Sequence, residues 1–323
     1  MSISIGIEIG GTKIQAGVGL RNDRLLARAR TQVNVEKGAQ GILEAIPVLV
    51  DEALRESGRS LEEIVGVGVG FGGPVDTKRG VALVSHQIDG WDQFPLLDWL
   101  QEQWSVPAAI QNDASLAGYA EALLGAGKGR RRIFYMTIGS GIGGGWIVDG
   151  KIEEGQGLGA AEIGHTWIPE PDTGEPQKLE WICSGWGIGN RAREAVEEGE
   201  ASILTELCDR DSSRIDAKMV YAAVERDDLL ACTILDETCT ALALAICNAV
   251  SLLHPERVVI GGGVSLMGPL FWDNLQEKIQ RYVFQPFAGT FDVVPASLGE
   301  DVVVVGGALL GLEIAGLREK NNS

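Results

Sequence analysis

The sequence is poor in the features that stabilise small secreted proteins. Its five cysteines lie at positions 183, 208, 232, 239 and 247, and no two of them form a Cys-x-x-Cys pair. An odd number of scattered cysteines does not make a disulfide framework. Thiols of this kind are typical of proteins in a reducing compartment. A disulfide-stabilised extracellular domain is therefore excluded.

Positive charge is also scarce. The chain has 27 Lys and Arg against 45 Asp and Glu, which gives a formal net charge of −18. A nucleic-acid surface needs a basic field that displaces counterions, and an anionic membrane attracts the same kind of surface. Neither partner is expected. One basic cluster, residues 128–132, lies between a predicted helix and a predicted strand, and we interpret it as a solvated turn.

Long apolar runs are absent as well. No uninterrupted run approaches the length of a membrane span. The first residues, MSISIGIE, lack the basic segment and apolar core of a signal peptide. The cytoplasm is therefore the expected location. The 323 residues, of which 45% are hydrophobic, suffice for about two globular domains with a core each.

One pattern of strand, glycine turn and strand occurs twice. Residues 3–9 (ISIGIEI) precede Gly10-Gly11 and a second apolar strand, residues 14–20. Residues 131–138 (RRIFYMTI) precede a glycine turn over 139–145 and then a strand over 146–152. The repetition indicates an internal duplication. Glycine supplies the positive φ of tight turns, whose backbone N–H groups can bind phosphate oxygens.

The rest of the chain predicts further strands and helices. A helix over 41–56 is expected to bury Ile42, Leu43, Ile46, Leu49 and Val50, and Pro47 is expected to kink it or delay its start. Residues 302–317 (VVVVGGALLGLEIAGL) are interpreted as a strand, a Gly-Gly turn and a closing helix. The other expected strands are 25–31, 64–71 and 258–260, and the other helices are 95–104, 113–124, 216–224, 228–253 and one that Ser184 caps.

Asp113 lies between the two repeats, where a predicted strand ends and a helix begins. Ligands of open α/β sheets bind at the carboxyl ends of strands. A carboxylate there, without a basic neighbour in sequence, can act as a general base. Asp is also a favoured N-cap of helices. Both interpretations of Asp113 stay open on these residues alone.

The glycine turns allow two kinds of phosphate site. Residues 139–144 match GxGxxG, but the dinucleotide fingerprint requires a helix after the glycines, and a strand is predicted here. A Rossmann site is therefore excluded. Either hairpin alone indicates only a tight turn. Two matched hairpins, a third glycine turn at 261–263 and an acid between the repeats favour a clamp on the phosphates of a nucleoside triphosphate.

Seven motifs in a fixed order resemble the ROK family of sugar kinases over nearly the whole chain. GIEIGGTK (6–13) and TIGSGIGGG (137–145) resemble its two phosphate loops, and VVIGGGVS (258–265) resembles its adenosine loop. The sugar-side and catalytic motifs are GVGFGGPVD (68–76), QNDASLAGYAE (111–121), GAAEIGH (159–165), and Leu179-Glu180 followed by Ser184-Gly185.

The resemblance implies a fold and an activity. The fold is α/β, a two-domain actin-like ATPase (ribonuclease H-like) fold with an interdomain cleft. One domain would comprise 1–117 with 304–323, and the other 118–303. The activity is ATP- and Mg²⁺-dependent phosphorylation of a hexose hydroxyl, with the 6-hydroxyl of glucose as the first choice. Asp113 would remove the proton of that hydroxyl.

The resemblance also implies the residues of each site. Glu8 would hold a Mg²⁺-bound water. Carboxylates and amides suit a sugar because they accept hydrogen bonds from its hydroxyl groups. The sugar residues would be Gly73, Gln87, Asn112, Asp113, Glu162, His165 and Glu180. The ATP residues would be Gly10, Gly11, Thr12, Lys13, Gly139, Ser140, Gly141, Gly143, Gly261 and Gly262.

Three departures from the family pattern stand out. Glu8 replaces an Asp, and His86-Gln87 replaces Pro-Asn. The CxCGxxGC zinc segment is missing, because residues 166–178 contain no cysteine. A structural zinc site takes four ligands, mostly thiolate and imidazole, so no zinc is predicted. The loop after His165 is expected to be held by Trp167, Ile168 and the prolines at 169, 171 and 176 instead.

Two other functions remain as alternatives. The family includes sugar-responsive repressors, whose DNA-binding segment precedes the first phosphate loop. Here that loop begins at Gly6 and the net charge is negative, which disfavours this function. A non-catalytic sugar-binding protein is favoured by Glu8 and Gln87 and disfavoured by Asp113 and both glycine loops. The identity of the hexose (glucose, fructose or an N-acetylhexosamine), polyphosphate in place of ATP, and a homodimer are left open.

Overall fold

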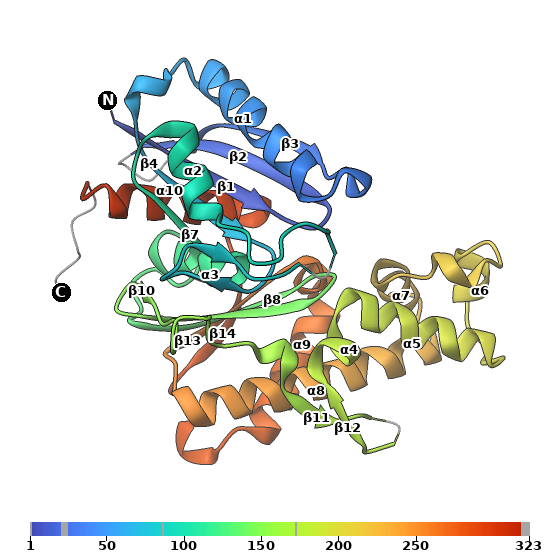
Figure 1. Cartoon of the computed structure of the whole chain (residues 1–323). Coiled ribbons are helices and arrows are strands. Elements are labelled where there is room, and N and C mark those ends of the chain that lie inside the picture. The colour runs from blue at the N-terminus through green and yellow to red at the C-terminus, as the bar shows by residue number, and fades with distance from the viewer. Residues whose placement is uncertain (1, 21–24, 86, 172, 318–323) are drawn as a thin grey trace. The chain divides into compact units, whose positions relative to one another are not determined.

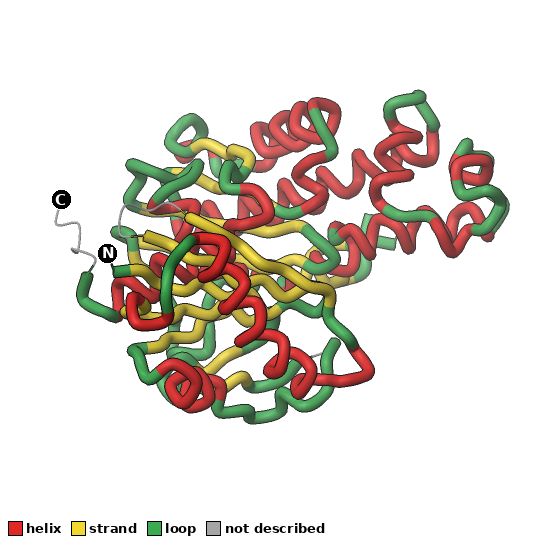
Figure 2. The backbone as a smooth tube through the Cα atoms, turned by 90° about the horizontal axis from the view of Figure 1, so that it is seen from above, coloured by secondary structure: helices red, strands yellow, loops and turns green. Residues whose placement is uncertain are grey.

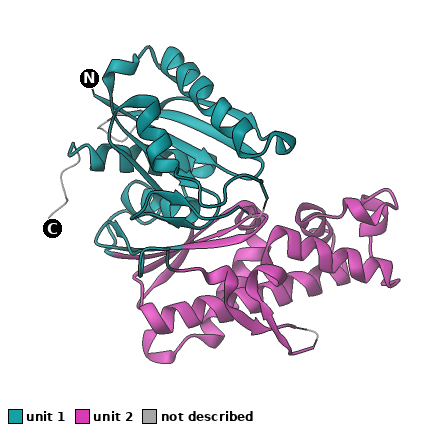
Figure 3. Cartoon of the chain, viewed as in Figure 1, with its two compact units in different colours: residues 1–131, 145–160, 297–323 teal, residues 132–144, 161–296 magenta. Residues whose placement is uncertain are grey.

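The computed structural model describes residues 2–20, 25–85, 87–171 and 173–317. These residues form two compact units (Figure 3). The first comprises residues 1–131, 145–160 and 297–323, and the second comprises 132–144 and 161–296. As domains, the segments 1–117 with 304–323 and 118–303 remain a prediction. The chain contains both helices and strands, drawn in red and yellow in Figure 2.

The first unit contains a five-stranded sheet with the order β3-β2-β1-β4-β7. β1 pairs antiparallel with β2 and parallel with β4, and β4 pairs parallel with β7. The strands predicted at 3–9 and 64–71 are confirmed with these bounds. The strands of this sheet are β1 (Ile3–Ile9), β2 (Lys13–Leu20), β3 (Leu25–Gln32), β4 (Ile64–Phe71) and β7 (Ala108–Asn112).

Helices cover both faces of this sheet (Figure 1). α1 packs on β2 and β3, and the five side chains predicted on its buried face are all buried. α1 begins at Gly38 and runs through Pro47, so the predicted delay of its start is wrong. The remaining elements of the unit are α1 (Gly38–Ser57), β5 (Val75–Asp76), β6 (Val81–Ala82), α2 (Leu96–Trp104), α3 (Asp113–Leu123), β10 (Lys151–Ile152) and α10 (Val302–Ile314).

α10 replaces the strand and Gly-Gly turn that the sequence predicts at residues 302–307. A run of valines favours a strand locally. Here the helix lies against glycines of β1 and β4 instead. A Cβ atom on Gly6, Gly66 or Gly68 would lie only 1.9, 2.1 or 2.2 Å from carbonyl oxygens of α10. Glycine in a strand therefore marks the close approach of another backbone, and this contact overrides local propensity.

The second sheet repeats the topology of the first. Its order is β10-β9-β8-β13-β14. When the strands of each sheet are numbered along the chain, both sheets have the order 3-2-1-4-5. This confirms the internal duplication. The strands are β8 (Arg132–Ile138), β9 (Ile142–Val148), β13 (Arg257–Gly261) and β14 (Asp292–Pro295). The predicted strand over 146–152 is wrong in its bounds. β9 begins four residues earlier, and a turn at Asp149-Gly150, both with positive φ, separates it from β10.

Helices and a short hairpin make up the rest of the second unit. α8 is long and apolar enough to cross a membrane, and no other helix among the described residues meets that test. Asp236 and Glu237 interrupt its apolar run, and it packs against α4, α7 and α9 as a core helix. The elements are β11 (Trp167–Pro169), β12 (Pro176–Lys178), α4 (Leu179–Cys183), α5 (Gly185–Glu197), α6 (Leu204–Leu207), α7 (Ala217–Val224), α8 (Leu229–Leu253) and α9 (Pro269–Tyr282).

Candidate active site

Asp113 is the first residue of α3, directly after β7. The N-cap of the helix is the preceding residue, Asn112, whose Oδ1 accepts from the backbone N–H groups of Ala114 and Ser115 at 3.0 and 3.1 Å. The interpretation of Asp113 as the cap is therefore wrong. Asp113 Oδ1 accepts from Ala114 N–H at 2.7 Å. Its Oδ2 lies 3.4 Å from the position that a Cβ of Gly72 would take.

Asn112 also connects the helix to the predicted sugar-side loop. Its Nδ2 donates to the carbonyl oxygen of Gly73 at 3.2 Å. Gly72 N–H donates in turn to the carbonyl of Ile9, at the end of β1, at 2.8 Å. The structure thus brings together three predicted segments, the first glycine turn, the sugar-side loop and the start of α3.

The first glycine turn connects β1 to β2. Gly10 N–H donates to Lys13 O at 3.1 Å and closes the turn. Gln87 lies directly over it, because a Cβ on Gly11 would fall 1.4 Å from Gln87 Oε1. Gln87 was expected to contact the sugar, but its side chain lies at the first glycine turn, which is a predicted phosphate site. A side chain at position 11 would require the Gln87 amide to move.

Glu8 precedes this turn in a buried position. Its side chain is only 8% exposed, accepts a hydrogen bond from Gln15 Nε2 and lies 3.5 Å from Lys13 Nζ. Burial raises the pKa of the Glu8 carboxyl above its ordinary value, while the hydrogen bond from Gln15 and the charge of Lys13 lower it. Gln15 Oε1 is buried without a hydrogen-bond partner among the described residues. An acceptor without a donor therefore lies beside the carboxylate.

The second glycine turn connects β8 to β9. Glu180 Oε2 accepts from Ile142 N–H at 2.7 Å, and a Cβ on Gly141 would lie 2.6 Å from the same oxygen. Gly139 O accepts from Gly185 N–H, at the start of α5, at 2.7 Å. Glu180 is thus placed against the phosphate-side turn as well as being a predicted sugar residue. The predicted helix cap at Ser184 is confirmed by its hydrogen bond from Gly187 N–H.

Glu162, His165 and Glu180 lie near one another in the second unit. Glu162 directly precedes a 3₁₀ turn, Ile163–His165, whose last residue is His165. Desolvation raises the pKa of the Glu162 carboxyl, the charge of His165 lowers it, and Glu180 raises it. The net effect raises the pKa of Glu162. The charges of His165 and Glu180 therefore act on the Glu162 carboxyl, as residues of one site would.

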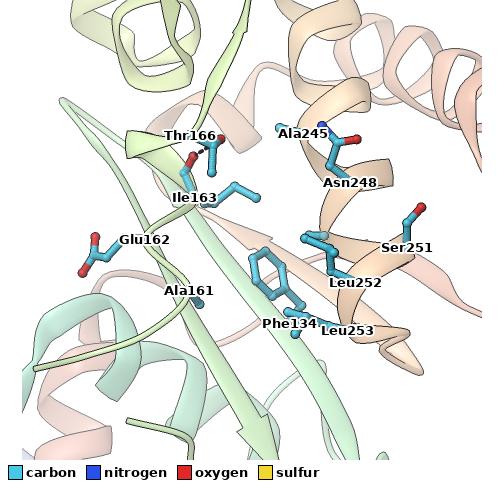
Figure 4. A pocket seen from close by; sticks show the side chains of 11 residues that line it. Phe134, Ala161, Glu162, Ile163, Thr166, Ala245, Asn248, Ser251, Leu252 and Leu253 are labelled. Carbon is cyan, nitrogen blue, oxygen red and sulfur yellow. Dashed lines mark hydrogen bonds between the residues drawn. The ribbon is translucent and has the colours of Figure 1, made fainter. Parts of the chain in front are cut away.

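A cavity of about 480 Å³ lies behind the Glu162 turn (Figure 4). Phe134 and the carboxyl-terminal part of α8 form its apolar walls, and Asn248 lies at its edge. The carboxylate of Glu162 points away from the other labelled side chains. Glu162 is nevertheless among the residues that line the cavity.

The third glycine turn, residues 261–263, follows β13. Gly262 has φ 85°, and a Cβ on it would lie 2.4 Å from Ile138 O at the end of β8. The glycine is required by this close approach. The second and third turns are therefore adjacent, as residues that contact one nucleotide would be.

The β11–β12 hairpin occupies the position of the missing zinc segment. Ile168 is buried, whereas Trp167 is 60% exposed and does not hold the loop as expected. The nearest thiol, Cys183, is buried and donates to Thr238 O at 3.6 Å. No group of three or more His, Cys, Asp or Glu side chains within the described part of the chain is arranged to hold a metal ion. The absence of zinc stays a prediction.

Glu154 contacts residues of the site, although no sequence motif predicts it as a site residue. Its carboxylate accepts from Gln111 Nε2 at 2.7 Å and from Thr77 Oγ1 at 3.0 Å. Gln111 begins the predicted catalytic segment, and Thr77 directly follows the predicted sugar-side motif 68–76. Both lie far from Glu154 in sequence. Only the folded chain brings these three residues together.

A model of the ROK family matches residues 4–314. The chain belongs to the ROK family. It is 32% identical to a glucokinase of Halalkalibacterium halodurans, over 98% of this chain and 97% of the relative, and 30% identical to a glucokinase of Thermotoga maritima, over 94% and 95%. A ROK glucokinase of Streptomyces griseus, solved with glucose and AMPPNP, is 30% identical, with a TM-score of 0.81 over 97% of this chain and all of the other. The predicted actin-like ATPase fold is thereby confirmed.

Proposed function

We propose that the protein is an ATP-dependent hexose kinase of the ROK family that phosphorylates the 6-hydroxyl of glucose. Glucokinases at about 30% identity over nearly full length support the reaction. The observation that carries the proposal is the start of α3. There Asn112 makes the helix cap, and Asp113 holds a carboxylate oxygen against the loop at Gly72.

Asp113 acts as the general base in this proposal. It accepts the proton of the attacking sugar hydroxyl while the hydroxyl oxygen forms its bond to the γ-phosphorus of ATP. The bond from that phosphorus to the bridging oxygen breaks, and ADP leaves with the electron pair. Asp113 is positioned for this by α3 and by the loop at Gly72. Positioning and charge stabilisation account for most of the catalysis of phosphoryl transfer.

The remaining hydroxyl groups of the sugar are held by Glu162, His165 and Glu180. Two carboxylates and an imidazole accept hydrogen bonds from hydroxyl groups and fix the orientation of the ring. Asn112 and the backbone of Gly73 hold the sugar-side loop against α3. The side chain of Gln87 lies at the first glycine turn, which departs from the sugar contact that the family pattern implies for this position.

ATP binds to the glycine turns. Gly10–Lys13 and Gly139–Gly143 hold the phosphates, and Gly261-Gly262 holds the adenosine. The acceptors at Glu8 and Gln15 fit the hydrated Mg²⁺ that accompanies ATP, because this ion keeps most of its water ligands. Mg²⁺ neutralises the charge of the phosphates when it is bound. Lys13, 3.5 Å from Glu8, adds a positive charge beside the turn.

The net charge and the free thiols of the protein support its proposed partners and location. A net charge of −18 supports a small-molecule hexose as the partner, without nucleic acid or membrane. The five cysteines are free thiols, which supports the cytoplasm as the location. We further assign residues 1–117 with 304–323 and residues 118–303 to two domains, and no zinc to either.

A coupled assay of ADP release tests this proposal. Purified protein is given ATP, Mg²⁺ and one sugar at a time from a panel of glucose, fructose, mannose and N-acetylhexosamines. We expect turnover with glucose and at least tenfold lower kcat/KM with the others, about the discrimination that one lost hydroxyl contact supplies. ADP release that no sugar stimulates would contradict a sugar kinase. Replacing ATP with polyphosphate in the same panel identifies the donor.

A further inference from the structure

Glu154 connects two segments of the first unit that flank Asp113. It follows β10 in the segment that leads along the chain to Glu162. One carboxylate oxygen accepts from Gln111 Nε2 at 2.7 Å, and the other accepts from Thr77 Oγ1 at 3.0 Å. Both carboxylate oxygens thus have a partner from a different segment.

Gln111 extends this contact to the catalytic segment. Its side chain is buried, and its Oε1 accepts from the backbone N–H of Asn112 at 2.9 Å. Because Glu154 binds the amide nitrogen of Gln111, it fixes which end of that amide faces Asn112. The Gln111-Asn112 peptide, one residue before Asp113, is therefore held by a chain of two hydrogen bonds that begins at Glu154.

Thr77 extends the contact to the sugar-side loop. It follows Asp76, at the end of the motif 68–76, and the next residue, Lys78, donates to Gln156 O at 3.2 Å. The two residues that directly follow this loop, Thr77 and Lys78, are thus bound to the segment 154–156. Glu154 holds both the loop and the end of β7.

We propose that Glu154 is a positioning residue for the phosphoryl transfer, acting through Gln111 on the Gln111-Asn112 peptide, one residue before Asp113, and through Thr77 on the sugar-side loop. The proposal rests on the kinase function proposed above. Misplacement of a reacting group by about 1 Å can cost ~10²-fold in rate, so a residue outside the site can control turnover. Glu154 itself does not touch the reacting atoms.

Substitutions at position 154 separate this role from a general structural one. Glu154→Ala removes both acceptors and frees the Gln111 amide to turn. Glu154→Gln retains an acceptor for Gln111, and the Thr77 hydroxyl can turn to accept from the new amide. The glutamine variant should therefore restore most of what alanine loses. Glu153→Ala is the matched control, because Glu153 is the exposed neighbour and its side chain makes none of these contacts.

The first measurement is steady-state kinetics with glucose and ATP. We expect Glu154→Ala to lower kcat by about tenfold or more while KM for ATP stays within about twofold. Glu154→Gln should stay within about threefold of the parent, and Glu153→Ala should match it. The urea concentration at the midpoint of unfolding is measured for Glu154→Ala in parallel. Activities are compared without urea, where every variant is folded.

The second measurement is amide hydrogen exchange at Asn112, which does not depend on activity. Loss of the Gln111 contact should make this amide exchange about fivefold faster in Glu154→Ala, and not in Glu154→Gln or Glu153→Ala. Unchanged exchange in Glu154→Ala, or faster exchange with unchanged kcat, overturns the positioning role. A parent protein without sugar-stimulated ADP release overturns the kinase proposal instead, and the exchange result still decides whether Glu154 holds the peptide.

Discussion

Asp113→Asn changes one atom type at the start of α3 and little else. The helix cap is unaffected because Asn112 makes it, with hydrogen bonds from the N–H groups of Ala114 and Ser115. The new side chain has nearly the same size, and its oxygen can still accept from Ala114 N–H as Asp113 Oδ1 does at 2.7 Å. The substitution therefore removes the basic oxygen and leaves the local fold intact.

The two expected effects differ widely in size. Loss of a general base costs ~10²–10⁴-fold in kcat, which corresponds to about 2.7–5.5 kcal/mol in the activation free energy. The free energy of unfolding should change by less than about 0.5 kcal/mol, as at a position without a packing or capping role. By contrast, Asn112→Ala should lower the free energy of unfolding by about 1 kcal/mol, because it removes the cap.

The assay is coupled ADP release with glucose, run beside urea unfolding of each variant. Asp98→Asn is the matched control, since Asp98 is an exposed aspartate in the first turn of α2. It should change neither kcat nor stability. Near-full activity of Asp113→Asn would refute the role of Asp113 as a base. A large loss of stability in Asp113→Asn would show that its carboxylate is structural.

Three further predictions follow from the same structure. Glu8→Gln should raise the Mg²⁺ concentration for half-maximal rate and leave KM for glucose unchanged, and an unchanged Mg²⁺ titration would remove Glu8 from the site. Gly68→Ala should lower the free energy of unfolding by about 1–3 kcal/mol, because its Cβ would lie 2.2 Å from Gly307 O in α10; equal urea midpoints would contradict this close approach. Elemental analysis should find less than stoichiometric zinc, and EDTA followed by Mg²⁺ alone should restore activity, whereas zinc that survives dialysis would contradict the missing site.

Local patterns predicted the elements that carry most of the site. The alternation of ISIGIEI and the Gly10-Gly11 pair gave β1 and its turn with the observed bounds. The repeat of that pattern in the second half predicted the internal duplication, and the shared strand order confirms it. Asp113 could be placed at a strand–helix junction for the same reason. Strand alternation, glycine turns and helix periodicity are properties of adjacent residues, and they need no knowledge of the rest of the fold.

Features that depend on distant segments could not be predicted. The valines of α10 favour a strand locally, and only the glycines of β1 and β4 allow a helix there. Asp and Asn both favour N-caps, so adjacent Asn112 and Asp113 cannot be told apart by propensity. Gln87 reaches Gly11, and Glu154 reaches Gln111, across long stretches of sequence. No local pattern contains those contacts.

Phosphorus NMR of the reaction product tests the central claim most directly. The protein is incubated with glucose, ATP and Mg²⁺, and the sugar phosphate is identified by its coupling to the protons of the esterified carbon. The account predicts a single monoester that couples to two protons, as the 6-phosphate of glucose does, and it predicts that Asp113→Asn forms almost none. A monoester that couples to one proton would place the phosphate on a ring hydroxyl or the anomeric carbon. Release of inorganic phosphate without any sugar phosphate would contradict the kinase itself.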